Sequence, residues 1–519
     1  MLVALTIVLA GCSVSPEKLY TEELDKIAAD RISRVVTQQE PINGPIDLYE
    51  AMARALKYNL DYKVKLAEQA LRSQELKNIR LDMLPKLVAN AGYSSRDSDP
   101  GGSSRLIDAP FTESLRNSTS QEREHFTGDL TVSWNVLDFG LSYIRARQQS
   151  DEILIAMEQR RKVANRIIED VRTAYWRAVS SQLLLAELGA LETRVNDALE
   201  NSAILEVNGN SSPMKALMYR RELMSIKLQI KALHRDFSVA KHQLAALMSI
   251  APTQEFELVT TIENSRMPDI RNTGNNLIKV ALRDRPELRE LNYQMRINSR
   301  QTRAALLKLL PSLNFKAGYN FDTNKYLHDQ NWASWGATVG WNLFNIARYP
   351  KEKEKAKSHQ YLLDQRALAM SMAVMTQVHI SLARYVLAQD ELNANSEYLE
   401  IQNEILRLYS ASRDTGRIGQ QEWIREKMNT LVARAKHGLA YADLQNVYAN
   451  IYASIGQDAF PLVVDGSESV EVLGAALREY WEDRQGMVNS DEDVQAQVKR
   501  DSGPIVLSGY LRTDFRGVQ

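Results

Sequence analysis

Four segments of the chain alternate apolar and polar residues with a period of two, which is the pattern of a β-strand whose two faces meet different surroundings. The predicted strands cover residues 86–93, 129–137, 312–322 and 335–344. In the third segment, Leu313, Phe315 and Ala317 alternate with Asn314 and Lys316. Each segment therefore has one apolar and one polar face.

The length of these segments matches a transmembrane β-strand, which needs about 9–11 residues. A soluble hairpin packed on a core shows the same alternation, so that alternative stays open for any single pair of strands. In hydrocarbon an open sheet edge leaves backbone groups unpaired, so a spanning sheet must close, and bacterial barrels start at about eight strands. Several copies of the chain must then pool their strands. We expect a wet lumen lined by Lys86, Asn135, Asn314, Lys316 and Asn342.

Between the strand pairs, Pro and Gly are rare and apolar residues recur at spacings near three and four, which predicts long amphipathic helices. The predicted long helices are 141–208 and 348–415, each about 100 Å at 1.5 Å per residue. Returning helices at 214–250 and 421–455, and entering helices at 47–83 and 276–309, are about half as long. One returning and one entering helix, stacked end to end, would match one long helix.

The chain repeats itself, which divides it into two similar halves. Residues 51–93 match 277–319 at an offset of 226, and beyond Tyr93 the offset becomes 207, so that Trp134-Asn135 meets Trp341-Asn342. The difference of 19 residues is a longer polar loop in the first half. We expect a first repeat at 47–270, a second at 271–456 and an extension at 457–519 with a helix near 470–481.

The chain begins with a short apolar run that ends in Leu9-Ala10-Gly11-Cys12. This run is too short to span a bilayer as a helix but has the size of a signal-peptide core. The ending resembles the bacterial lipobox, which implies a signal peptide at 1–11, a lipid on the sulfur of Cys12 and a lipidated segment at 12–46. Ser13 in place of Asp points to the outer membrane. No Lys or Arg precedes the run, which is consistent with a start upstream of Met1.

Composition excludes several classes of protein. Lys plus Arg (64) balance Asp plus Glu (65), which removes the positive charge that a nucleic-acid binder needs. Cys12 is the only cysteine, and His234 and His242 lack a carboxylate arranged to complete a metal site. No phosphate-binding loop, dinucleotide fingerprint or nucleophile elbow occurs. We therefore expect no enzymatic activity, cofactor or metal.

The repeated motif Leu-Pro-x-Leu followed by Ala-Gly-Tyr, together with Trp-Asn-Val-Leu-Asp-Phe-Gly at 134–140 and Trp-Asn-Leu-Phe-Asn at 341–345, closely resembles the TolC-type outer-membrane efflux family over about residues 45–456. The resemblance implies a mainly α fold with a transmembrane β-barrel portion. In such a homotrimer, four strands per chain build one 12-stranded barrel, and the duplicated helical hairpins form a periplasmic α-barrel. It also implies a periplasmic adaptor protein and an inner-membrane pump of the RND or ABC type as partners.

The resemblance places adaptor contact and the periplasmic gate at the tips of the two helical hairpins. The matching residues are Asn208, Gly209 and Asn210 at the first tip, and Thr415, Gly416 and Arg417 at the second. A helix C-terminal turn explains both glycines equally well without any partner. Just past the second tip, Glu422 matches an acidic gate position, but Arg425 stands where a second acid is expected. A Glu422–Arg425 ion pair on an exposed helix, worth about 0.2–0.5 kcal/mol, is the alternative.

Two functions from different classes fit these patterns. The first is a passive export duct through the outer membrane, fed by the adaptor and pump of an efflux or secretion system. The second is a periplasmic coiled-coil adaptor or structural rod that makes no pore. Four alternating strands in two pairs favour the duct.

Overall fold

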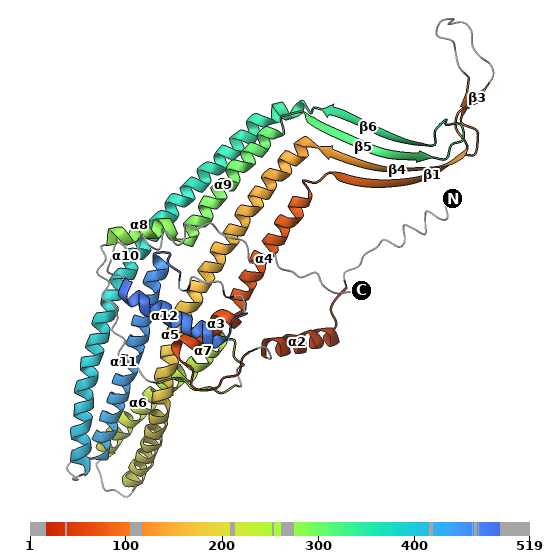
Figure 1. The fold of residues 1–519 in the computed structure, drawn as a ribbon. Coiled ribbons are helices and arrows are strands. Elements are labelled where there is room, and N and C mark those ends of the chain that lie inside the picture. Colours follow the sequence, from red (N-terminus) through yellow and green to blue (C-terminus); the bar gives the residue numbers. More distant parts are fainter. Residues whose placement is uncertain are drawn as a thin grey trace.

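The computed structural model describes residues 17–36, 39–103, 117–207, 213–251, 254–260, 274–414, 419–458, 460, 464 and 467–487. The molecule is elongated, with a β-sheet at one end and helices that run from it to the opposite end (Figure 1). Among the described residues, no helix combines the length and the apolar character that crossing a bilayer requires.

The sheet consists of β1 (Lys86–Ser95), β4 (Glu124–Asn135), β5 (Ser312–Asp322) and β6 (Asn331–Gly340). All neighbours are antiparallel, in the order β1-β4-β5-β6. β4 and β6 begin five and four residues earlier than predicted and end two and four residues earlier. β4 starts early because the alternation extends back to Phe126, whose ring lies 4.9 Å from that of Tyr93. Two short strands, β2 (Gly101–Gly102) and β3 (Ser118–Thr119), pair within the polar loop, where no strand was predicted.

The two predicted long helices are α5 (Val136–Val207), with 72 residues, and α10 (Phe344–Asp414), with 71 residues. At 1.5 Å per residue, each is roughly 105 Å long. α5 begins directly after β4, three residues separate the end of β6 from the start of α10, and both helices end at the far end of the molecule (Figure 1). Most of the shorter helices pack against these two continuous helices.

Each entering helix is broken into two pieces, which the hydrophobic pattern did not predict. In the first repeat, α3 (Leu48–Tyr58) is followed by α4 (Leu60–Leu81), and the side chain of Asn59 between them accepts hydrogen bonds from the backbone at the start of α4. In the second repeat, α8 (Gly274–Asp284) is followed by α9 (Pro286–Leu307), and Arg285 between them is extended. Pro286 explains the second break, because proline disfavours the α conformation of the preceding residue. Asn59 and Arg285 are separated by the repeat offset of 226.

The returning helices complete each hairpin. In the first repeat, α6 (Pro213–Ser238) and α7 (Ala240–Leu247) pack on α5, and in the second, α11 (Gln420–Ser454) packs on both α5 and α10. α4 covers the sheet-proximal part of α5, whereas α6 and α7 cover the distal part (Figure 1). This confirms the predicted end-to-end arrangement of entering and returning helices.

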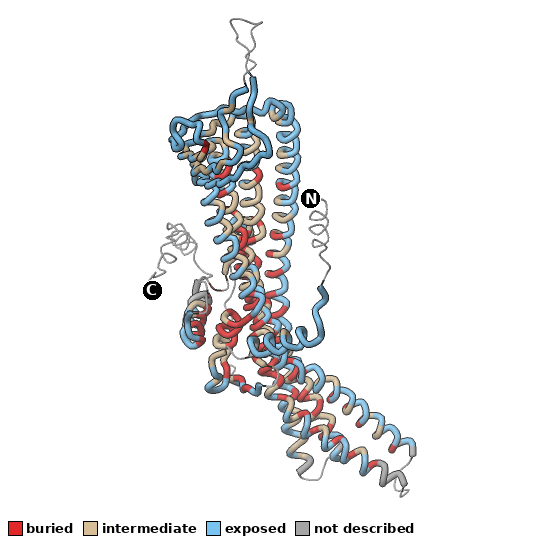
Figure 2. The backbone as a smooth tube through the Cα atoms, turned by 90° about the vertical axis from the view of Figure 1, so that its right-hand side faces the viewer, coloured by how far each residue is buried: buried red, intermediate tan, exposed pale blue. Residues whose placement is uncertain are grey.

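The main hydrophobic core lies around the middle of the long helices, where α3, α7, α8 and α12 (Val470–Met487) gather around α5, α10 and α11. Figure 2 shows the buried residues concentrated there, whereas the strands are largely exposed. α12 confirms the helix predicted in the extension. It packs on α3, and its Trp481 stacks 4.5 Å over the buried guanidinium of Arg172. The remaining helix, α2 (Thr21–Val36), is mostly exposed.

Candidate functional site

The register of the sheet sorts its residues into two chemically distinct faces. Asn90 stands opposite Asp129, which stands opposite Asn320, so one polar row crosses three strands. The neighbouring row places Ala89, Leu130 and Tyr319 on the other face. Since side chains alternate across a strand, every second row repeats this separation.

Hydrogen bonds between strands hold the polar face together. Asn90 Nδ2 donates to both carboxylate oxygens of Asp129, at 3.2 and 3.1 Å, and Thr131 donates to the same group at 2.9 Å. On the next strand pair, Asn320 Nδ2 donates to Ser334 Oγ at 2.9 Å. These polar side chains therefore form hydrogen bonds with one another on an exposed surface of the sheet.

Three of the five predicted lumen residues, Lys86, Asn314 and Lys316, lie on the polar face. Asn135 lies there too, but its side-chain oxygen accepts hydrogen bonds from the backbone nitrogens of Leu137 and Asp138, at 2.9 and 3.1 Å. It therefore caps α5.

Asn342 lies beyond the end of β6, and its side-chain oxygen accepts from the backbone nitrogen of Phe344 at 3.1 Å, at the start of α10. Assigning the two asparagines to the lumen lining was therefore incomplete. Their shared place in the repeat reflects the same strand-to-helix transition in both halves.

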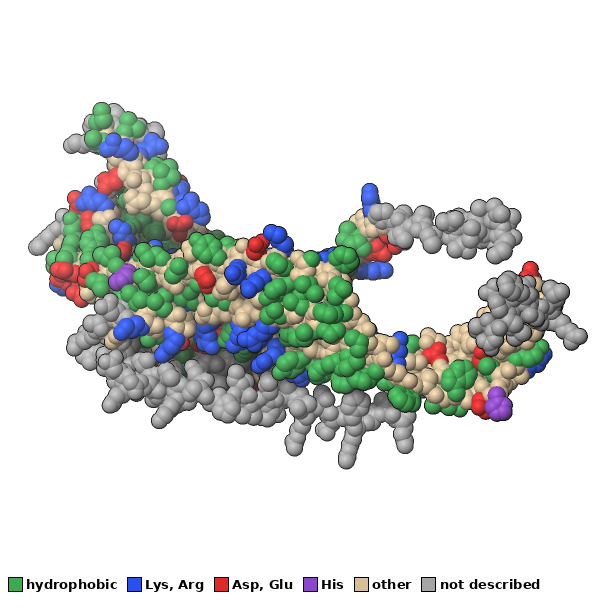
Figure 3. Space-filling model, turned by 90° about the horizontal axis from the view of Figure 1, so that it is seen from above, with side chains coloured by type: hydrophobic (Ala, Val, Ile, Leu, Met, Phe, Trp, Pro, Cys, Tyr) green, Lys and Arg blue, Asp and Glu red, His purple; other side chains and the backbone are tan. Residues whose placement is uncertain are grey.

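The apolar face carries large exposed side chains, which water disfavours and hydrocarbon does not. Trp335 is 90% exposed and Val339 71%, and Phe344, where α10 begins, is 80% exposed. Viewed from above, hydrophobic side chains gather where the helices meet the sheet, and Lys and Arg side chains lie over the helices beside them (Figure 3). An exposed apolar area of this kind marks a surface that faces a membrane or a partner.

At the opposite end, the predicted tip residues 208–210 and 415–417 lie outside the described residues, as does Cys12. The possible gate residues lie in the described part. Glu422 is exposed in the first turn of α11, and Arg425 is half-buried one turn later.

The alternative interpretation, a Glu422–Arg425 ion pair, is wrong, because Arg425 pairs with other carboxylates. Arg425 Nη1 lies 3.5 Å from Glu222 Oε1 on α6, and its Nε lies 3.2 Å from Glu426 Oε1. These carboxylates, with hydrogen bonding to Glu426 the largest cause, raise the pKa of Arg425. Sequence reasoning missed Glu222, which is 203 residues away. Arg425 therefore ties the returning helix of one repeat to that of the other.

A half-buried polar network crosses the middle of the bundle. Glu169 of α5 accepts a hydrogen bond from Asn450 Nδ2 of α11 at 3.4 Å, and Ser381 of α10 donates to Asn450 Oδ1 at 2.9 Å. Burial raises the pKa of Glu169 to about 7. The titratable carboxyl group of Glu169 is thus connected, through Asn450, to two helices of the other repeat.

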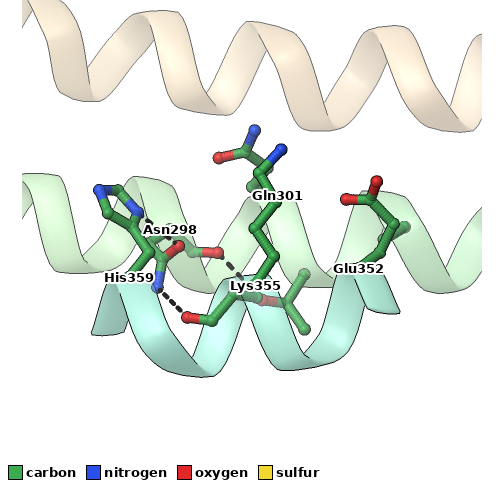
Figure 4. A pocket seen from close by; sticks show the side chains of 8 residues that line it. Asn298, Gln301, Glu352, Lys355 and His359 are labelled. Carbon is green, nitrogen blue, oxygen red and sulfur yellow. Dashed lines mark hydrogen bonds between the residues drawn. The ribbon is translucent and has the colours of Figure 1, made fainter. Parts of the chain in front are cut away.

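A small polar cavity of about 60 Å³ lies between α9 and α10. Figure 4 shows His359 and Asn298 pointing toward each other, with Nδ1 and Oδ1 3.0 Å apart, and Asn298 Nδ2 donates to the carbonyl of Ala356 at 3.2 Å. Glu352 and Lys355 stand on the same helix as His359 (Figure 4). Among the residues that the structure describes, no group of three or more His, Cys, Asp or Glu is placed to hold a metal ion. The cavity residues hold α9 to α10.

Comparison with known proteins bears on this two-faced sheet and its long helices. A family model described as "Outer membrane efflux protein" matches residues 277–457. The resemblance to the outer-membrane efflux proteins is confirmed. No curated protein sequence matches the chain significantly.

Solved structures of outer-membrane channels share the fold. The Neisseria gonorrhoeae MtrE outer membrane channel in its open state superposes with a TM-score of 0.60 at 17% identity, covering 81% of this chain and 91% of that one. The Campylobacter jejuni CmeC outer membrane channel gives 0.59 at 14% identity, covering 92% and 98%. The Vibrio cholerae outer membrane protein VceC gives 0.58 at 12% identity, covering 79% and 96%. At these identities the similarity shows the fold, which is mainly helical with few strands.

Proposed function

We propose that the chain is the outer-membrane channel of a tripartite efflux or secretion system, and that three copies form one 12-stranded barrel continued by a helical barrel in the periplasm. The observation that carries the proposal is the open, two-faced sheet. Within the described residues, the outer edges of β1 and β6 have no partner strand. In a membrane, such edges must pair, and neighbouring copies supply the partners.

The number of copies follows from the strands and from the resemblance together. Four strands are too few for a barrel, since bacterial barrels have at least about eight. The efflux family to which the chain is similar uses three copies. The polar face, with Lys86, Asp129 and Asn320, then lines a wet conduit.

The remaining expectations belong to the same proposal. The hairpin tips at 208–210 and 415–417 would contact a periplasmic adaptor, and Glu422 with Arg425 would narrow the conduit near the second tip. The C-terminal ends of α5 and α10, which lead to these tips, lie far from the sheet (Figure 1). Cys12 would carry the lipid anchor, and palmitate labelling of the wild type, lost in Cys12→Ala, tests this.

Two variants that each add one cysteine test the conduit. Thr338→Cys places a thiol on the polar face, opposite Asn314, and Ala337→Cys places one on the apolar face, opposite Phe315. A charged, membrane-impermeant thiol reagent is expected to lower the conductance of Thr338→Cys trimers in planar bilayers and to leave Ala337→Cys unchanged. Wild type controls for Cys12. Absence of conductance in all three proteins would favour a rod or adaptor without a pore.

A further inference from the structure

An excess of positive charge lies in the groove between the packed helices α5 and α9, one to three helical turns below the apolar junction with the sheet. Arg296 and Arg300 of α9 bind a single carboxylate, that of Asp151 of α5, and Arg147 and Arg303 lie one helical turn from Asp151 and Arg300 along the same helices. Arg296 Nη2 donates to Asp151 Oδ1 at 2.5 Å, and Arg300 binds its other oxygen.

The charge of the groove is not balanced within the protein. Asp151 is 2% exposed and is fully engaged by Arg296 and Arg300. Arg147 and Arg303 are exposed, and neither has a carboxylate partner among the ion pairs of the described residues. Burial is the largest cause that lowers the pKa of Arg300. The attraction of Asp151 raises this pKa, and the neighbouring guanidinium groups of Arg296 and Arg147 lower it. The groove thus carries four guanidinium groups and one carboxylate, and this excess of positive charge favours the binding of an anionic ligand.

The groove opens on the same side as the apolar face of the sheet. Trp134, on that face of β4, contacts Phe139 of α5 with ring centroids 5.8 Å apart. Phe139, Tyr143 and Arg147 are spaced by four residues and so share one face of the helix. The Arg147 guanidinium lies 5.7 Å from the Tyr143 ring. Aromatic residues followed by arginines are the arrangement expected where a protein surface leaves the hydrocarbon and enters the headgroup region.

The helix α9 repeats this order on the other wall of the groove. Arg296, Arg300, Arg303 and Leu307 recur at spacings of four, three and four, which places them on one face. A Cβ on Gly140 of α5 would lie 3.6 Å from Leu307, so this face is turned toward α5 near the sheet. On both helices, apolar residues therefore lie nearest the sheet and arginines lie farther from it.

A neighbouring copy would not cover the groove. The helices follow the strands in the order α4, α5, α9, α10, so α5 and α9 are the inner pair and only α4 and α10 border another copy. Arg147 is 12 residues beyond the end of β4, about 18 Å along the helix, and its side chain leans toward the helix N-terminus and hence toward the sheet. The Arg147 side chain thus points toward the headgroups, which extend several Å beyond the hydrocarbon, whereas α9 ends at the sheet and its arginine side chains lean away from it.

We propose that the α5/α9 groove binds the phosphate of an anionic phospholipid in the periplasmic leaflet, with Arg147 and Arg303 as its main ligands and Asp151 positioning Arg296 and Arg300 beside them. The proposal rests on the membrane orientation given under Proposed function. One such site per chain gives three per trimer.

The test uses the intact trimer in neutral detergent, with phosphatidylglycerol or phosphatidylcholine added and bound lipids counted by native mass spectrometry. Wild type is expected to bind phosphatidylglycerol preferentially, up to three per trimer. Arg147→Gln with Arg303→Gln is expected to weaken this binding roughly 30-fold, at about 1 kcal/mol per basic residue and 1.4 kcal/mol per tenfold. Arg147→Lys with Arg303→Lys should retain most of it. Lys353→Gln with Lys357→Gln removes two exposed cations of α10 and should change nothing.

Several outcomes overturn the proposal. These are equal binding of both lipids by wild type, an equal loss in the α10 control, or displacement of lipid by inorganic phosphate at matched concentration, which would indicate a free-phosphate site. Loss of trimers in the Gln variant without any change in lipid binding would indicate a protein interface. Planar-bilayer conductance is measured in parallel, so a protein that binds phosphatidylglycerol but conducts no ions contradicts the channel and leaves the lipid site standing.

Discussion

Gly456 lies against the backbone of Arg285, so closely that a Cβ on Gly456 would be 2.5 Å from the Arg285 nitrogen. Gly456 has φ +77°, in the left-handed region, and it ends α11 where α8 breaks into α9. Its counterpart in the first repeat, Ser249, also has a positive φ of 56°. The turn that follows the returning helix is therefore the same in both repeats. In the second repeat this turn packs directly on the break between the entering helices α8 and α9.

Gly456→Ala is expected to destabilise the protein by at least about 2 kcal/mol, because alanine is strained at this φ and its Cβ meets backbone that cannot move freely. The midpoint of thermal unfolding of the purified protein measures the change. Gly189→Ala is the matched control. Nothing lies within 4 Å of a Cβ at Gly189 inside α5, so alanine there should stabilise the helix by up to about 1 kcal/mol. Equal effects of the two changes would contradict this account.

Phe315→Asp is expected to prevent membrane assembly. Phe315 shares the apolar face with its cross-strand neighbours Trp134 and Ala337, and exchanging it for a carboxylate costs roughly 2 kcal/mol per copy if that face meets lipid. Heat-modifiable migration of trimers from outer-membrane extracts measures assembly. Lys316→Asp, one residue along on the polar face, should still assemble and should shift ion selectivity toward cations. Normal trimers of Phe315→Asp would exclude a lipid-facing Phe315.

Arg425→Ala is expected to loosen the far end of the bundle. The pair with Glu222 is partly exposed, with side chains 42% and 35% accessible, so it contributes no more than about 1 kcal/mol. Removing an interaction of this strength between α6 and α11 is expected to increase the open probability by up to about fivefold. Single-channel recording measures this probability. Glu222→Ala removes the same pair and should also raise the open probability, and the effect of the double variant should be smaller than the sum of the two single effects. Independent, additive effects would show that the two residues do not act as a pair.

Glu169→Gln is expected to alter the pH dependence of stability. Because the folded protein keeps the Glu169 proton up to about pH 7 whereas the unfolded chain releases it near pH 4.5, stability falls as pH rises through this window and is level above it. The shift is of the order of 3 kcal/mol. Glutamine cannot ionise, so the variant should lose this decline and melt at a higher temperature than wild type at pH 8. The exposed Glu391→Gln is the control, and an unchanged pH profile of Glu169→Gln would refute the assignment.

Much of the fold was predictable because its patterns are local. The period-two alternation around Phe315 located the strands and their faces, and long stretches without Pro or Gly predicted α5 and α10 to within a few residues. The break at Arg285 had a local signal in Pro286, but the equivalent break at Asn59 had only a capping side chain. A hydrophobic pattern that continues on both sides of such a break cannot reveal it.

The functional residues divide along the same line. The sequence by itself determined that one face of each strand is polar, since alternation needs no knowledge of neighbours. Tertiary structure alone decided that Arg425 pairs with Glu222 and that two arginines of α9 share one carboxylate of α5. These contacts depend on which helices lie side by side and on their rotation. Both are set by packing between segments more than a hundred residues apart, which periodicity within one segment does not encode.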